Sequence, residues 1–346
     1  MSARPKILFD PFPRRTDMFL APEMRTRLEA LGEVVLHEGS RMPAEMVERV
    51  LPEAMFVLGQ TDLPRERLER APKLKAIVNV EGNFQPNVDY GYCLDRGIHV
   101  LVIAPAFALP VAEMALGLAI DCARGITRAD RDFRQGRERY GIAGSTESLQ
   151  LTGNVFGLIG FGNLGRALLP LLRPFHGRVL AHDPWLPEGL LREHAVEPVG
   201  LDRLLAEARI VFMLAAATAD NQAMLGAREF GLIQQGSVFV LASRAAVVDF
   251  PAFLAAAKSG RIKAATDVFP VEPVPADDPV RGVEEVILSA HRAGGVRRAH
   301  HEIGLMTVED CELIARGLPP VRCQPARRET AHLFRSMPAR SYAQKV

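Results

Sequence analysis

The chain has 346 residues, a length that predicts about two domains with sizeable cores. Apolar residues make up 48% and charged residues 24%, which excludes a disordered, collagen-like or coiled-coil description of the whole chain. Lys and Arg together number 42 against 41 Asp and Glu, and this near balance argues against a general nucleic-acid-binding protein.

Short apolar runs alternate with helical patterns along the whole chain. Strands are predicted first at residues 6–9, 33–37, 54–58, 74–80 and 98–102. The helices of this first part are predicted at residues 22–31, 43–51 and 109–124. A second series of strands is predicted at residues 155–160, 178–181, 210–214, 237–241, 263–267 and 286–289. The helices of the second part are predicted at residues 163–175, 201–208 and 250–258. This alternation predicts an α/β fold with parallel sheets, because a parallel crossover needs a long connection.

Two stretches interrupt the alternation. Residues 124–150 are polar, charged and glycine-containing, and they predict a helix and a surface excursion. Residues 319–346 are rich in Pro and Arg, with six basic residues against one acidic residue, Glu329. This composition predicts an extended arm or a partly disordered end. A domain boundary is predicted near residues 103–107, just before the long apolar helix.

The four cysteines are scattered and form no C-x-x-C pair, so neither a zinc knuckle nor a redox motif is indicated, and we expect no metal site. Sparse thiols of this kind are typical of a reducing compartment. The first residues lead into a short strand-like run, without the apolar core of a signal peptide. No continuous apolar run approaches the length of a membrane span. We therefore expect a cytoplasmic protein without membrane or nucleic-acid partners.

A glycine-rich loop follows the first strand of the second series. Gly160, Gly162 and Gly165 form the pattern G-x-G-x-x-G between that strand and a predicted helix. The first glycine permits a tight turn, the second lets backbone approach a pyrophosphate, and the third lets the helix pack against the strand. Asn163 and Leu164 begin the helix, whose N–H groups and positive dipole end would face the phosphates. An unrelated α/β protein can use such a turn, but the surrounding pattern favours a dinucleotide site.

A carboxylate supports this interpretation and indicates the type of dinucleotide. Asp183 ends the next predicted strand, where its side chain can accept a hydrogen bond from a ribose 2′-hydroxyl. A carboxylate there repels a 2′-phosphate, and no Arg immediately follows it. The sequence therefore predicts NAD as cofactor, in preference to NADP.

Four motifs in this order resemble the D-isomer-specific 2-hydroxyacid dehydrogenases, the family of phosphoglycerate, glyoxylate and hydroxypyruvate reductases. The first is the glycine loop with Asp183. The others are the segments 241–249 (LASRAAVVD), 265–273 (ATDVFPVEP) and 289–295 (SAHRAGG). The resemblance extends over residues 6–317.

The resemblance implies an architecture and an assembly. It implies two doubly wound parallel-sheet domains, with a Rossmann NAD-binding domain at residues 105–290. This domain would be inserted in a flavodoxin-like substrate-binding domain made of residues 1–104 and 291–318. Residues 319–346 would form a C-terminal tail outside both. Such proteins are usually dimers, so we expect a homodimer.

Three residues of these motifs are candidates for catalysis of 2-keto acid reduction. His291 is the candidate acid and base, because it follows a strand end and imidazole titrates near neutral pH. Glu272 is its candidate partner, since a neighbouring carboxylate stabilises imidazolium. Arg244 is the candidate clamp for the substrate carboxylate and keto oxygen. Each alone has an ordinary structural interpretation, and it is their joint occurrence in family order that favours catalysis.

Further residues match the family's cofactor and substrate loops. Asp267 matches a residue that accepts a hydrogen bond from the nicotinamide carboxamide. Ser243 and Thr218 match loops near the cofactor, although Thr218 can equally serve as a helix cap. Glu81, Gly82 and Asn83 match the loop whose backbone N–H groups meet the substrate carboxylate. With Arg244 and His291 they are the candidate substrate-binding residues.

Two departures from the family pattern concern the substrate. Glu81 stands where the family commonly has a small residue, and an acid there opposes a second anionic group unless it is turned away or paired. Arg292 stands where the family often has an apolar residue, and it could pair with Glu81, bind a distal phosphate or face solvent. These departures leave the identity of the hydroxy acid open.

The sequence as a whole predicts an enzyme that transfers a hydride between NAD(H) and a small polar 2-keto or D-2-hydroxy acid. The alternative is an NAD(H)-sensing regulatory or scaffold protein on a dehydrogenase fold. Formate dehydrogenase, which shares the architecture, is disfavoured because that group has Gln where this chain has Glu272.

Overall fold

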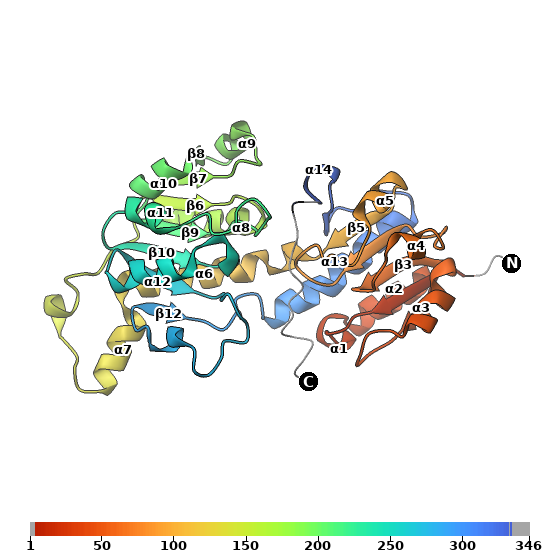
Figure 1. Cartoon of the computed structure of the whole chain (residues 1–346), viewed down its shortest axis with the longest axis horizontal. Helices are drawn as coiled ribbons and strands as arrows, with labels where there is room; N and C mark the ends of the chain where they lie inside the picture. Colours follow the sequence, from red (N-terminus) through yellow and green to blue (C-terminus); the bar gives the residue numbers. More distant parts are fainter. Residues whose placement is uncertain (1–3, 332, 334–346) are drawn as a thin grey trace. The chain divides into compact units, whose positions relative to one another are not determined.

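The computed structural model describes residues 4–331 and 333, and the chain divides into two compact units (Figure 1). Unit 1 takes in the chain up to Phe107, residues Thr218–Asp220 and the chain from Gly295 on. Unit 2 comprises Ala108–Ala217 and Asn221–Gly294. The domain limits expected from the sequence at residues 104 and 290 thus stand at 107 and 294 in this division.

Unit 1 is built on a six-stranded sheet in the order β13-β5-β4-β3-β1-β2. Its strands are β1 (Lys6–Asp10), β2 (Glu33–Leu36), β3 (Ala54–Gly59), β4 (Ala76–Asn79), β5 (His99–Val102) and β13 (Gln324–Pro325). Its helices are α1 (Thr16–Phe19), α2 (Pro22–Leu31), α3 (Ala44–Val50), α4 (Arg65–Leu68), α5 (Tyr90–Asp95), α13 (Arg297–Ala315) and α14 (Arg328–Ala331). Strands β1 to β5 run parallel in the flavodoxin-like order 2-1-3-4-5.

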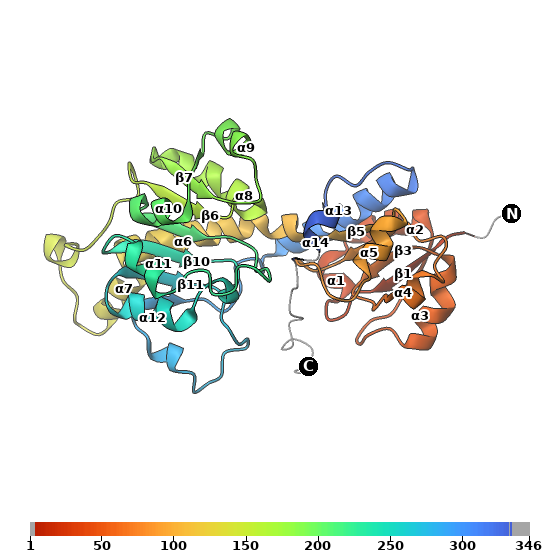
Figure 2. The ribbon, with the colours of Figure 1, turned by 45° about the horizontal axis from the view of Figure 1, so that its top comes forward.

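The strands of unit 1 are buried on both faces, which explains their continuous apolar sequence. In β1, Ile7 and Phe9 belong to one core and Leu8 to the other, because successive side chains point to opposite faces. Helices α1, α2 and α13 cover the first face, and helices α3, α4, α5 and α14 cover the second. Figure 2 shows the sheet of unit 1 between these two helical layers.

The composition of the segment after Gly317 predicts an extended arm. In the structure this segment instead packs against the rest of unit 1. Strand β13 pairs antiparallel with β5, with Gln324 opposite Val102, and Cys323 is buried. A two-residue strand has too few positions to leave a periodic pattern in the sequence. Of the basic residues expected in the arm, Arg335, Arg340 and Lys345 lie outside the described residues.

A buried carboxylate on α13 holds this segment in place. Asp310 is fully buried, and it accepts hydrogen bonds from the backbone N–H groups of Val321, Arg322 and Cys323 at 2.8, 3.0 and 2.7 Å. One side chain therefore satisfies three consecutive main-chain donors, a result that no local sequence pattern predicts.

Unit 2 is built on a seven-stranded parallel sheet in the order β12-β11-β10-β9-β6-β7-β8. Its strands are β6 (Phe156–Ile159), β7 (Val179–His182), β8 (Glu197–Pro198), β9 (Ile210–Met213), β10 (Ser237–Leu241), β11 (Ile262–Thr266) and β12 (Val286–Leu288). Its helices are α6 (Ala108–Arg124), α7 (Ile126–Arg134), α8 (Asn163–Leu172), α9 (Glu188–Glu193), α10 (Leu201–Glu207), α11 (Ala227–Leu232) and α12 (Phe250–Lys258). This is the doubly wound arrangement expected from the sequence, and the order reverses between β9 and β6.

Helix α6 explains an apolar stretch that could be taken for a membrane span. With the preceding turn it forms the segment Ala104–Arg124, which is long and apolar enough to span a membrane by length and composition. This differs from the expectation that no run has the required length. Ala112, Ala115 and Ala119 of α6 are fully buried in the core of unit 2, and α6 packs on α8. We read it as a core helix.

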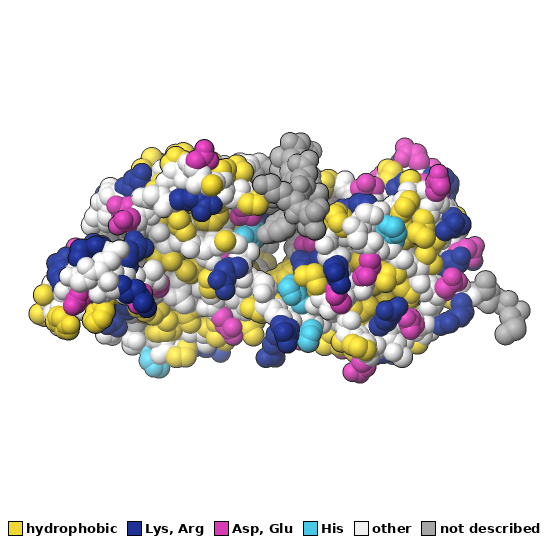
Figure 3. Space-filling view, turned by 90° about the horizontal axis from the view of Figure 1, so that it is seen from below, with side chains coloured by type: hydrophobic (Ala, Val, Ile, Leu, Met, Phe, Trp, Pro, Cys, Tyr) yellow, Lys and Arg dark blue, Asp and Glu magenta, His cyan; other side chains and the backbone are white. Residues whose placement is uncertain are grey.

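The stretch after α6 leaves the core of unit 2. Helix α7 has no buried residue, and the loop that follows it contains a short 3-10 turn at Gly141–Gly144. Phe133, Tyr140 and Ile142 are 62, 76 and 86% exposed. Figure 3 shows hydrophobic and basic side chains together on the surface of this excursion. The excursion expected at residues 124–150 is thus present, with an apolar surface that the composition alone did not indicate.

Candidate active site

The glycine loop after β6 has the geometry that a dinucleotide requires. Gly160 adopts a φ of +95°, and a Cβ there would lie 2.7 Å from the backbone nitrogen of Ala215 at the end of β9. A Cβ on Gly165 would lie 2.8 Å from the carbonyl oxygen of Gly160, so the third glycine lets α8 pack close to the loop. A Cβ on Gly162 would meet nothing within 4 Å, which leaves space beside the start of α8.

This loop fits a pyrophosphate for a further reason. Gly162 is the N-cap of α8 and, as a glycine, has no side chain to cap this end of the helix. Asn163 and Leu164 therefore begin a ten-residue helix whose first N–H groups point toward the open space. The loop lies where the strand order reverses, which is the usual binding position in such sheets.

Asp183 lies at the end of β7, next to the glycine loop. One carboxylate oxygen accepts a hydrogen bond from Phe161 N at 2.8 Å, and the other accepts one from Trp185 N at 3.0 Å. A cavity of about 520 Å³ opens beside it, lined by His182, Asp183, Leu191, Val199 and Arg203 among others. The carboxylate retains lone pairs for a further donor, so it can still accept from a ribose hydroxyl.

The other candidate residues of unit 2 follow three neighbouring strands. Arg244 comes after β10, Asp267 after β11 and His291 after β12, and these strands are adjacent in the sheet. Because the carboxyl ends of parallel strands meet at one edge, residues distant in sequence come together there. Glu272 lies in the connection between β11 and β12.

His291 and Glu272 form a hydrogen-bonded pair. His291 Nδ1 lies 2.5 Å from Glu272 Oε2, and the two side chains are 36% and 21% exposed. Glu272 Oε1 accepts a hydrogen bond from Phe269 N at 2.8 Å. His291 adopts a φ of 48°, a left-handed conformation that is uncommon outside glycine and typical of functional sites. The ring nitrogen Nε2 is therefore the one left to face a substrate.

The environment keeps Glu272 ionised. Burial raises the pKa of this carboxyl. Hydrogen bonds from His291 and Phe269 and the positive charge of Arg244 lower the pKa, and together they outweigh the effect of burial. The net result is a pKa below the ordinary value for Glu. Glu272 thus acts as a hydrogen-bond acceptor that fixes the orientation of the imidazole. Arg244 lies near enough for its charge to act on Glu272, and its Nη1 donates to the carbonyl oxygen of Ser243 at 2.6 Å.

Asp267 holds the loop that carries His291. Its carboxylate accepts hydrogen bonds from Ser289 Oγ at 2.5 Å, Arg292 N at 3.1 Å and Ala293 N at 3.0 Å. The residue is only 2% exposed. Its expected role toward the nicotinamide carboxamide stays a prediction, whereas these bonds show what positions His291. Sequence reasoning missed Ser289 as a partner, although it begins the fourth motif.

The candidate substrate loop lies in unit 1, directly after β4. Ile103 N donates to the carbonyl oxygen of Glu81 at 3.2 Å, and a Cβ on Gly82 would lie 3.3 Å from the ring of Phe107. Glu81, Gly82 and Asn83 are all partly exposed. Glu81 forms an ion pair with Arg14 at 3.0 Å. Of the two dispositions considered for Glu81, the paired one is observed, and its partner within unit 1 is Arg14. Sequence reasoning missed Arg14, which no motif contains.

Two further candidate residues, Thr218 and Ser243, are buried. Thr218 is buried and belongs to a segment that groups with unit 1, apart from the NAD-binding domain in which it was expected. Ser243 is buried as well, with its carbonyl oxygen bonded to Arg244. Their expected contacts with the cofactor stay predictions.

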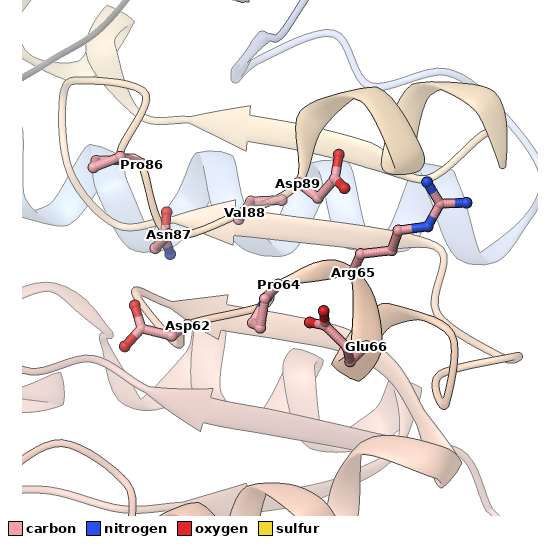
Figure 4. A pocket seen from close by; sticks show the side chains of 8 residues that line it. All are labelled: Asp62, Pro64, Arg65, Glu66, Pro86, Asn87, Val88 and Asp89. Carbon is pink, nitrogen blue, oxygen red and sulfur yellow. The ribbon is translucent and has the colours of Figure 1, made fainter.

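A second hollow of about 430 Å³ lies on unit 1 between α4 and α5 (Figure 4). Its polar side chains serve local structure. Asp89 accepts from Tyr92 N as the cap of α5, Asn87 Nδ2 donates to Thr61 O, and Arg65 pairs with Glu69. We therefore assign no ligand to it. Among residues 4–331 and 333, no group of three or more His, Cys, Asp or Glu side chains is placed to hold a metal ion.

Known proteins resemble this chain in sequence and in structure. The profile described as "D-isomer specific 2-hydroxyacid dehydrogenase, NAD binding domain" matches residues 116–293, more than half of the chain. A D-3-phosphoglycerate dehydrogenase of Archaeoglobus fulgidus is 30% identical over 80% of this chain and 53% of its own length. A glyoxylate reductase of Korarchaeum cryptofilum is 29% identical over 85% of this chain and 90% of its own length. The chain spans about half the length of the phosphoglycerate dehydrogenases that it matches.

A solved structure gives the same result. The crystal structure of a phosphoglycerate oxidoreductase from Rhizobium etli is 42% identical, with a TM-score of 0.84 over 94% of this chain and 100% of that one. The glycine loop, Asp183 and the matched profile identify the nucleotide of unit 2 as a nicotinamide dinucleotide. The chain belongs to the D-isomer specific 2-hydroxyacid dehydrogenase family.

Proposed function

We propose that the protein reduces a small polar 2-keto acid to the D-2-hydroxy acid with NADH, and catalyses the reverse oxidation. The observation that carries this proposal is the His291–Glu272 pair, with Nδ1 bound to the carboxylate and Nε2 on the opposite side of the ring. Family membership supports the reaction class. The direction in the cell depends on the supply of keto acid and hydroxy acid.

Reduction of a keto acid needs a hydride, a proton and a fixed positive charge. The glycine loop and Asp183 would hold NADH, which would supply the hydride. His291 Nε2 gives a proton to the nascent alkoxide, and in oxidation it removes the proton from the hydroxyl group. Glu272 accepts the hydrogen bond from His291 Nδ1 and holds the ring in one orientation. Arg244 binds the substrate carboxylate and polarises the keto oxygen. The family resemblance supports a further proposal, that the loop at Gly82 and Asn83 of unit 1 contributes backbone N–H groups to substrate binding.

We propose NAD as cofactor, in preference to NADP, on the charges of the cavity beside β7. Asp183 and Glu188 both line it; Glu188 pairs with Arg192 at 2.6 Å, whereas Asp183 forms no ion pair among the described residues. Arg203 also lines it, but its guanidinium pairs with Glu207 at 2.6 Å and with Glu197 at 2.7 Å. Its positive charge is thus compensated, and a 2′-phosphate entering the cavity would meet net negative charge.

The experiment that tests the function is NADH oxidation with a panel of keto acids, including glyoxylate, hydroxypyruvate and a 2-keto sugar acid, with NADPH in parallel. We expect turnover with NADH on at least one of them and a preference of about 10²-fold or more for NADH. Asp183→Ser removes the repelling carboxylate and should reduce this preference at least tenfold. The matched control Asp202→Ser removes an exposed carboxylate elsewhere in unit 2 and should leave it unchanged. A wild-type preference for NADPH would overturn the assignment of Asp183.

Binding of NADH without turnover on the whole panel would instead favour the NAD(H)-sensing alternative. We also propose a cytoplasmic location, because all four cysteines are free and buried.

We further propose that the protein is a homodimer that buries the excursion after α6. Phe133 and Ile142 expose most of their apolar surface, and α7 buries none of its residues. Exposed apolar surface of this extent marks an interaction site, and a second copy of the chain is the partner that a family of dimers implies.

Phe133→Asp should therefore convert the dimer to a monomer, because it places a charge within the apolar contact. Light scattering after size-exclusion chromatography measures the mass. Leu318→Asp changes a comparably apolar residue, 47% exposed on unit 1, and should leave the mass unchanged. A monomeric wild-type protein, or a Phe133→Asp variant that stays dimeric, would contradict the proposal.

A further inference from the structure

The turn that carries His291 is closed by hydrogen bonds from residues on both sides of it. Ser289 Oγ donates to Asp267 Oδ1 at 2.5 Å, and Arg292 N donates to the same oxygen at 3.1 Å. His291 N donates to the carbonyl oxygen of Ser289 at 3.1 Å. A single carboxylate oxygen of unit 2 therefore joins the chain before His291 to the chain after it. We call residues 289–293 the His291 turn.

Asp267 is a fixed anchor for this turn. It is 2% exposed, and its backbone N–H donates to the carbonyl oxygen of Leu241 in β10 at 3.1 Å. On either side of Asp267, Thr266 Oγ1 donates to Val268 O at 2.7 Å and accepts from Val268 N at 3.2 Å. Ala293 N donates to the second carboxylate oxygen, Oδ2, at 3.0 Å. The carboxylate is thus held in place by its own segment and has little freedom to follow a turn that moves.

The closed turn explains the backbone conformation of His291. Its φ of 48° lies in the left-handed region, which is unfavourable for a residue with a Cβ atom. Such a conformation persists where the surrounding contacts enforce it. The hydrogen bonds from Ser289 and Arg292 to one oxygen of Asp267 are contacts of this kind. In this conformation His291 Nδ1 lies 2.5 Å from Glu272 Oε2, so the orientation of the ring depends on the turn.

Ser289 contributes the part of this arrangement that depends on residue type. The donors at Arg292 and Ala293 are backbone N–H groups, which every residue except proline offers. The donor at Ser289 is a side-chain hydroxyl group. Ser289 N donates to the carbonyl oxygen of Thr266 at 2.9 Å and so extends the pairing of β11 with β12. Replacement of the side chain therefore removes one hydrogen bond and leaves the end of the strand in place.

Building on the proposed function, we propose that Ser289 is a positioning residue for His291. Its hydroxyl group, through Asp267, holds the His291 turn in the conformation that directs the imidazole toward Glu272. Arg244, the proposed clamp for the substrate carboxylate, follows a different strand, β10. Loss of the Ser289 hydroxyl group therefore affects proton transfer and leaves substrate binding largely unchanged.

The test compares Ser289→Ala, which removes the hydroxyl group, with Ser289→Thr, which retains it at a strand end where threonine is well tolerated. Ser289→Ala should lower kcat about tenfold and leave KM for the keto acid within about twofold of wild type, because only the position of the acid and base is lost. Ser289→Thr should keep kcat within about twofold of wild type. This split between kcat and KM, with rescue by threonine, does not follow from a general loss of stability.

A second readout needs no turnover. Amide hydrogen exchange, followed by NMR in the absence of substrate, reports on the Arg292 N–H group that donates to Asp267. Its exchange should be about tenfold or more faster in Ser289→Ala than in wild type, and close to wild type in Ser289→Thr.

Ser237→Ala is the matched control. Ser237 is also a serine of unit 2 with a hydrogen-bonded hydroxyl group, which accepts from Arg209 Nη1 at 3.2 Å. It begins β10 and so lies at the opposite edge of the sheet from the strand ends of the candidate site. Its replacement should leave kcat and the exchange of Arg292 unchanged. A wild-type kcat in Ser289→Ala, or an equal loss of kcat in Ser289→Ala and Ser289→Thr, would overturn the positioning role.

A protein that turns over no keto acid would contradict the proposed function and not the role of Ser289 in the turn. The exchange measurement then decides. Faster exchange of Arg292 in Ser289→Ala, with rescue in Ser289→Thr, would support that role, and unchanged exchange in Ser289→Ala would reject it.

Discussion

Replacement of His291 by asparagine is expected to lower kcat for keto acid reduction by about 10²- to 10⁴-fold. Asparagine tolerates the left-handed backbone that His291 adopts at a φ of 48°, and it retains hydrogen-bonding capacity toward Glu272. It cannot exchange a proton with the substrate near neutral pH. Binding of NADH, measured by fluorescence titration, should stay within about twofold of wild type, because the glycine loop and Asp183 are unchanged.

His176→Asn is the control for the backbone. His176 is also a histidine of unit 2 with a positive φ, at 53°, but it lies after α8 and away from the candidate site. Its replacement should leave kcat unchanged. Turnover at the wild-type rate in His291→Asn would remove His291 from the mechanism.

The state of Glu272 adds a pH dependence. Because its folded pKa lies below the ordinary value, the carboxylate supports His291 throughout the neutral range and loses this role only as pH falls through that lowered pKa.

Asp267→Asn is expected to affect both stability and turnover. In the wild-type protein both carboxylate oxygens accept hydrogen bonds, three in all. In the variant one oxygen is replaced by an NH₂ group. This group faces another donor, so at least one of the three hydrogen bonds is lost. Loss of such bonds costs about 2–4 kcal/mol, which lowers the unfolding midpoint by about 5 °C or more. The loop carrying His291 then loses its fixed position, and kcat should fall about 10²-fold.

Asp310→Asn separates the two effects. Asp310 is equally buried and also accepts three hydrogen bonds, from the backbone of Val321, Arg322 and Cys323 in unit 1. Its replacement should lower the unfolding midpoint similarly and leave kcat close to wild type. Equal losses of kcat in both variants would show that Asp267 acts through stability alone. A rise in KM for NADH without a fall in kcat would favour the nicotinamide contact expected from the family.

The parts of the site that the sequence predicts are those defined by local spacing. Gly160, Gly162 and Gly165 lie within six positions, and the structure shows a separate reason for glycine at each. Gly160 has a positive φ, Gly162 leaves open space beside the loop, and Gly165 lets α8 pack closely against the loop. The strands were predictable because burial on both faces makes them continuously apolar, as in β1 and β6.

What the sequence could not predict depends on contacts between distant segments. Arg14 and Glu81 are 67 residues apart, and the position of each is set by a different strand end. Ser289 and Asp267 were both inside recognised motifs, yet their hydrogen bond follows only from the adjacency of β11 and β12. Asp310 accepts hydrogen bonds from backbone N–H groups just before β13. Because every residue type except proline has such a group, the sequence gives no sign of this contact.

The discontinuous course of unit 1 has a consequence for how the protein folds during synthesis. Ile303 and Met306 of α13 fill the same core as Ile7 and Phe9 of β1, so one face of the first sheet is covered only by α1 and α2 until α13 has been made. All of unit 2 is translated in between, together with residues 218–220 of unit 1. Domains usually complete in order from the N-terminus. Here unit 2 starts later than unit 1 but is complete first. The β1–β5 sheet of unit 1 therefore emerges from the ribosome with a partly uncovered apolar face, which a chaperone or the incomplete helical layer must shield.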